Sequence, residues 1–256
     1  MLDRRSFLTA LAGAAALPRP ALATAGETAD AAAILARADE YRNFRGRAFR
    51  FRLTLVNHEA GRDPREFQLA AEILNPHTSL VVYREPASES GKALLMDGRN
   101  LWFSTPTTSR PIRITPQQRL VGEASNGDVA STDFSGDYDP RLVGKDSVQG
   151  VACLKLELTA KPDSMAAYQR LLLWVRADDH RPVKADFFGP SGKRLKSAWY
   201  RRFEPLPELG VASQLTELEI VNALDESRRT VMRYRDFQVG DVPESHFTTA
   251  YLRRLR

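Results

Sequence analysis

Beyond residue 46 the chain alternates apolar and polar residues with a period of two, and this pattern restricts the fold more than any other feature. The first such run has Arg and Thr on one side and four apolar residues on the other, namely Phe49, Phe51, Leu53 and Leu55. This alternation is typical of a β-strand with one buried face. Further strand-like runs occupy 66–74, 78–84, 92–97, 100–105, 109–114, 141–148, 151–159, 168–177, 182–188, 193–203, 211–222 and 228–238. Short links rich in turn-forming residues separate them, so the sequence predicts one large antiparallel sheet.

Helix-like segments are few. Residues 28–41 are rich in helix formers with helical apolar spacing, and Thr28 is a candidate cap. Residues 244–255 predict a short closing helix. A sheet of ten or more strands tends to curl, and its concave side must be covered. Two outcomes stay open: an incompletely filled apolar hollow that binds a hydrophobic molecule, or a barrel filled by its own side chains.

The N-terminus reads as an export signal. A twin-arginine pattern, R-R-x-F-L, begins at Arg4, and the apolar run 8–17 follows it. This run is too short to span a bilayer, and A-x-A cleavage sites end at Ala23 and Ala25. The pattern favours the Tat route, with an ordinary Sec signal as the alternative.

Export determines what is expected of the mature chain. We predict a cleaved signal peptide at 1–25 and a single domain at 26–256, soluble in the periplasm. No cysteine follows the cleavage site, so no lipid anchor is expected, and the lone Cys153 excludes an intramolecular disulfide or a thiolate zinc site. The formal net charge of +5 is only weak evidence for a nucleic-acid partner, and export of the chain argues against one. The slight basic excess is compatible with transient contact at an anionic membrane surface.

Residues that carry chemistry do not form a known catalytic pattern. The four histidines, which we interpret as solvated, fit no metal-binding spacing, and there is no nucleophile elbow or phosphate loop. Four acids invite a metal site, but their spacing does not match a calcium loop. We interpret them as residues that build turns and cap short helices, with an incidental cation or catalysis as alternatives: Asp128, Asp133, Asp137 and Asp139. The sequence therefore predicts no enzyme, no metal and no cofactor.

Three segments carry a family resemblance. The block from Leu94 to Asp139 includes MDGRNLWFSTP and SNGDVASTDFSGDYD, a later segment beginning at Trp174 reads WVRADDHRPVKA, and FTTAYL begins at Phe247. These segments resemble the periplasmic outer-membrane lipoprotein-sorting proteins, a less characterised branch of the LolA-like superfamily. The likeness covers most of the chain after the signal.

The resemblance implies a mainly β fold: a curved antiparallel sheet forming a half-open β-barrel, with short helices as a lid over an apolar cavity. It implies a non-enzymatic carrier that binds acyl chains of lipids or lipoproteins for transfer toward the outer membrane. An inner-membrane lipid exporter or an outer-membrane acceptor would be its partner. A periplasmic sensor or adaptor that uses the same fold to bind a protein is the alternative. Six residues are candidates for lining the cavity: Phe49, Phe51, Leu53, Leu55, Trp102 and Trp174.

Overall fold

The computed structural model describes residues 25–108, 110–130 and 133–255. The predicted signal peptide lies outside these residues except for Ala25, which begins the first helix. Thirteen strands form one antiparallel sheet in the order β6-β5-β4-β3-β2-β1-β15-β14-β13-β12-β11-β10-β9. Their bounds are β1 Phe49–His58, β2 Arg65–Asn75, β3 Thr78–Glu85, β4 Ala93–Asp97, β5 Asn100–Ser104, β6 Ile112–Ile114, β9 Tyr138–Val148, β10 Val151–Ala160, β11 Arg170–Arg176, β12 Pro182–Phe188, β13 Arg194–Leu206, β14 Val211–Asn222 and β15 Arg229–Val239.

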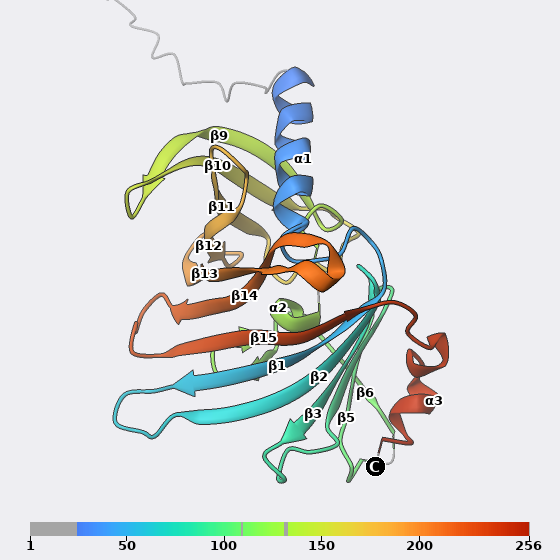
Figure 1. The fold of residues 1–256 in the computed structure, drawn as a ribbon. Helices are drawn as coiled ribbons and strands as arrows, with labels where there is room; N and C mark the ends of the chain where they lie inside the picture. The colour runs from blue at the N-terminus through green and yellow to red at the C-terminus, as the bar shows by residue number, and fades with distance from the viewer. Residues whose placement is uncertain (1–24, 109, 131–132, 256) are drawn as a thin grey trace, which may run out of the picture.

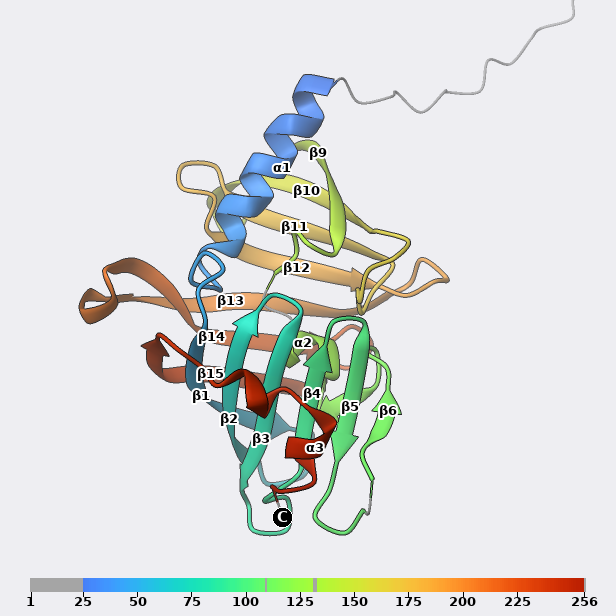
Figure 2. The same cartoon turned by 90° about the vertical axis from the view of Figure 1, so that its right-hand side faces the viewer.

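The sheet is strongly curved but does not close. Among the described residues the edge strands β6 and β9 each have a single neighbour, and Figures 1 and 2 show them far apart at the two ends of the sheet. This confirms the half-open, mainly β architecture. The remaining elements are the small hairpin β7 Arg119–Val121 with β8 Ala124–Ser125, the helices α1 Ala25–Asp39, α2 Asn126–Ala130 and α3 Thr249–Leu252, and the 3-10 turns η1 Pro207–Leu209 and η2 Glu244–His246.

Most predicted strands are found within a residue or two of their expected ends, and two local expectations are wrong. The run 109–114 gives a strand of only three residues, since Pro111 lacks the N–H that a longer ladder would need. Thr28 lies inside α1, so it is not the helix cap.

Strand alternation gives the curved sheet two different faces. On the concave face, residues of β1 and its neighbours form the main core with α1 and α2. On the convex face, a smaller cluster packs β3 and β4 against the C-terminal segment, so the predicted closing helix α3 covers the outside of the sheet. The lid over the concave side therefore consists of α1, α2, the β7–β8 hairpin and the loops that connect them (Figure 1).

Candidate functional site

The concave face carries a continuous apolar wall beneath the lid. From α1, one stripe of small and branched side chains packs into this core: Ala31, Ile34, Leu35 and Ala38. Val129 and Ala130 of α2 join the same core. This spacing, three or four residues apart, places the stripe on one side of the helix and turns that side toward the sheet.

The β1 candidates lie where the alternation predicts. Phe49, Phe51, Leu53 and Leu55 all belong to the concave core and are at most 5% exposed. The rings of Phe49 and Phe51 stack with their centroids 5.8 Å apart. Arg52, between Phe51 and Leu53 on the strand, is exposed on the opposite face.

The two tryptophan candidates do not share this face. Trp102 pairs with Leu95, and both belong to the convex cluster under the C-terminal segment. Trp174 alternates with core residues of β11, and its indole Nε1 donates to Asp146 Oδ2 at 2.8 Å. The ammonium groups of Lys155 and Lys184 lie 4.9 and 4.8 Å from its ring. A tryptophan's size and hydrophobicity do not determine its face on a strand: Trp174 is buried and Trp102 is half-buried, each by groups outside the concave core.

In this form of the protein the concave side is filled. The cavities beneath the lid measure about 20 and about 30 Å³, each room for about one water molecule. Ligand pockets typically hold about 300–1,000 Å³. Side chains of the described residues therefore fill the space between lid and wall at these two points, and a larger, open pocket of about 630 Å³ lies beside the β7–β8 hairpin, lined in part by Ser125, Tyr168 and Lys196.

A buried ion pair joins the lid to the sheet. Lys196 of β13 pairs with the carboxylate of Asp128 in α2, and both side chains are less than a tenth exposed. Asp128 Oδ2 also accepts from the backbone N–H of Ser125 at 2.7 Å, and the Tyr168 hydroxyl lies 3.3 Å from Asp128 Oδ1. This hydrogen bonding offsets the cost of burying the two charges.

The other three acids have separate roles. Asp133 accepts from the Ser135 N–H, and Asp137, whose pKa is raised by burial, accepts from the Met165 N–H. Asp139 lies within β9 and pairs with β10. The interpretation as turn and cap residues thus fits Asp133 and Asp137, and also Asp128, which lies in the first turn of α2 and accepts from the Ser125 N–H, but not Asp139. No group of acids, histidines and cysteines in the described part of the chain is arranged to hold a metal ion.

A carboxyl group that sequence reasoning missed fixes the C-terminal end of α1. Asp39 is 3% exposed and accepts from the N–H of Phe134, the N–H of Ser135 and the Ser135 hydroxyl, the last at 2.6 Å. Burial, followed by a hydrogen bond with Asp133, raises the pKa of Asp39 to about 8. Its position four residues after the buried Leu35 was the available sequence signal, because it places the acid on the apolar stripe.

The raised pKa of Asp39 predicts a pH-dependent stability. Between its ordinary value of 3.8 and about 8, the folded chain holds a proton that the unfolded chain has lost, so stability falls as pH rises. The slope contributed by one proton is at most about 1.4 kcal/mol per pH unit. We expect Asp39→Asn to remove this slope in urea unfolding between about pH 5 and about pH 8. Asp30→Asn, an exposed change on the same helix, should retain it; identical slopes in both variants would contradict the assignment.

The described ranges contain no helix that is both long and apolar enough to cross a membrane. An open antiparallel half-barrel whose apolar concave wall is closed by an N-terminal helix defines the structural class. The comparisons agree with this class. A solved LolA superfamily protein from Nitrosomonas europaea, NE2245, is 34% identical with a TM-score of 0.79, covering 86% of this chain and 98% of that one. The chain belongs to the LolA superfamily.

Two more distant structures share the fold. A DUF1329 family protein from Desulfovibrio piger is 20% identical with a TM-score of 0.73, covering 88% of this chain and 99% of that one. A putative outer membrane lipoprotein-sorting protein domain from Vibrio parahaemolyticus is 17% identical with a TM-score of 0.71, covering 89% and 100%. A family model described as an uncharacterized protein matches residues 76–254. No curated protein gives a significant match.

Proposed function

We propose that the protein is an exported, non-enzymatic carrier that binds acyl chains of lipids or lipoproteins and transfers them toward the outer membrane. The observation that carries the proposal is the concave apolar wall, which is covered by the helices α1 and α2, the small β7–β8 hairpin and loops. An acyl chain that lies on the wall can replace the contacts of such a lid, because burial of each methylene contributes about 0.8 kcal/mol of favourable free energy. The likeness to NE2245 supports a binding role for the fold.

The packing of the lid on the concave wall determines how an acyl chain would enter and leave. The filled concave side means that α1 or α2 must move for a chain to enter, and the chain then replaces lid contacts on Phe49, Phe51 and their neighbours. Release requires an acceptor with a higher affinity for the chain. An inner-membrane exporter would supply the chain and an outer-membrane protein would accept it, with transient contact at the membrane surface.

Acyl uptake is the direct test. We expect native mass spectrometry of protein isolated from the periplasm to show bound lipid mass, and purified protein to take up a fluorescent fatty acid that a longer unlabelled chain displaces. Longer chains should bind more tightly, because each added methylene adds buried apolar surface. Bare protein that takes up no fatty acid would contradict the proposal. In that case a saturable protein complex, captured by crosslinking in cells, would favour the adaptor alternative.

A further inference from the structure

The thirteen-stranded sheet contains a seam. Strands β14 and β15 are paired only from Glu217 to Val221, opposite Arg233 to Arg229. Before Glu217, β14 stays paired with β13, whereas β15 beyond Arg233 stays paired with β1. The two strands therefore diverge, and Figure 1 shows the gap between the β13–β14 turn and β15.

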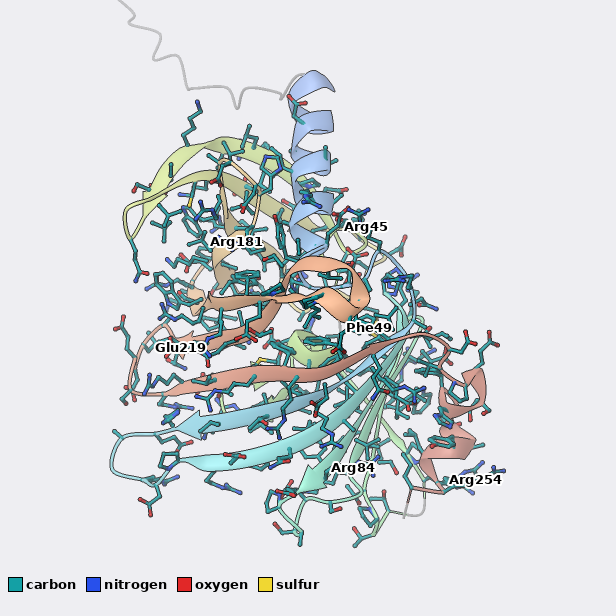
Figure 3. All side chains as sticks on the ribbon, in the orientation of Figure 1. Arg45, Phe49, Arg84, Arg181, Glu219 and Arg254 are labelled. Carbon is teal, nitrogen blue, oxygen red and sulfur yellow. The ribbon has the colours of Figure 1, made fainter. Side chains whose placement is uncertain are left out.

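The chain that follows α1 crosses this seam and closes it. The Leu215 N–H donates to the Tyr41 carbonyl at 2.8 Å, and the Gly240 N–H donates to the Ala48 carbonyl at 3.1 Å. Between these anchors, the ring of Phe44 packs on that of Phe49 with centroids 4.8 Å apart. Figure 3 shows Phe49 at this point, between the β13–β14 turn and β15.

Gln214 faces the enclosed side of the seam. The sheet pairs Arg202 with Glu217 and Phe203 with Leu215, so Thr216 is an extra residue that bulges β14. A bulge of this kind re-aims the neighbouring side chains. Both Gln214 and Leu215 consequently line the cavity of about 20 Å³ that Phe49, Phe51 and Phe237 wall on the apolar side.

The Gln214 amide carries an unsatisfied oxygen. The residue is 1% exposed, and its Oε1 has no hydrogen-bond donor among the described residues. Leaving a buried acceptor without a donor is costly, and the cavity that Gln214 lines is walled mainly by apolar and aromatic residues, with Arg42 and Asp128 as its charged members. A cavity that is aromatic on one side and ends in an amide oxygen matches a ligand that is apolar along its length and carries a hydrogen-bond donor at one end.

We propose that Gln214 is a specificity site for the linkage of an acylated ligand, and that it accepts a hydrogen bond from the amide N–H of an N-acyl chain. This inference rests on the proposed carrier function. The hydrocarbon of the ligand then lies along Phe49 and Phe51, and its amide group occupies the small cavity beside Gln214. An ester linkage has no donor and leaves Gln214 Oε1 unsatisfied.

A matched pair of ligands tests the site. N-methyldodecanamide and methyl dodecanoate differ only in N–H against O, and each is used to displace a bound fluorescent fatty acid from the full chain. We expect the wild-type protein to bind the amide about five- to tenfold more tightly, the effect of one hydrogen bond. Gln214→Met should bind both ligands alike. Gln68→Met, the same change on the convex face, should keep the preference.

The possible outcomes distinguish failure of the Gln214 site from failure of the carrier function. Equal binding of the two ligands by the wild-type protein, which needs no variant to fold, would overturn the site and leave the carrier function intact; the cavity would then hold only a water. A preference that persists in Gln214→Met would also overturn it. Binding of neither ligand, with no fatty-acid uptake, would overturn the carrier function together with the site.

Discussion

Leu53→Glu is expected to destabilise the protein by several kcal/mol, the largest effect of any single change on the concave wall. Leu53 is 0% exposed at the centre of β1, between the two neighbouring strands β2 and β15. A carboxylate there has no partner in the apolar core, so it either remains costly or takes up a proton. Urea unfolding monitored by circular dichroism measures the loss.

Arg52→Gln is the matched control for this change. Arg52 lies next to Leu53 but on the convex face, where its ion pair with Asp236 is exposed on both sides. Exposed pairs contribute about 0–1 kcal/mol, so stability should hardly change. At temperatures where both variants are folded, acyl uptake should be lost in Leu53→Glu and kept in Arg52→Gln. Equal losses in the two would show that the convex face carries the ligand.

The period-two pattern was sufficient to predict the sheet, because burial of one face is a local property of each strand. It placed Phe49, Phe51, Leu53 and Leu55 together on one buried face. It also placed most strands within a residue or two of their observed ends. The pattern failed for Trp102 and Trp174, since it shows that two faces differ without showing which one is inside. Trp174 lies under lysine side chains from both neighbouring strands, an arrangement that is apparent only once the strands are paired.

The buried polar contacts of the site could not be predicted from the sequence, for a different reason. Asp128 and Lys196 are 68 residues apart, and Asp39 binds a loop 95 residues away. Each of these contacts depends on the curvature of the whole sheet, which brings the lid onto the wall. Gln214 faces the core because of a bulge at Thr216, and no local feature of β14 marks that bulge. Alternation predicts strands, whereas buried polar partners require the complete topology.

The Asp128–Lys196 pair should be strongly coupled. Removing one partner of a buried pair costs about 3–5 kcal/mol, because the other charge stays buried alone. Asp128→Asn should therefore cost at least about 3 kcal/mol, since it removes the negative charge beside the Lys196 ammonium, whose other hydrogen-bond acceptor among the described residues is the uncharged Glu123 carbonyl at 3.1 Å. Lys196→Met should cost less, because the Asp128 carboxylate keeps its hydrogen bonds from the Ser125 N–H and the Tyr168 hydroxyl.

The double variant separates coupling from simple addition. With both charges removed, Asp128→Asn together with Lys196→Met should be more stable than Asp128→Asn alone, since no buried charge is left unpaired. Urea unfolding of the four proteins gives the coupling free energy, and the exposed pair Arg99–Asp163 serves as the control, with an expected coupling of about 0–1 kcal/mol. Additive losses at Asp128 and Lys196 would show that the pair does not hold α2 on the sheet. Strong coupling would identify it as the contact that has to break, or exchange its partners, when α2 leaves the apolar wall.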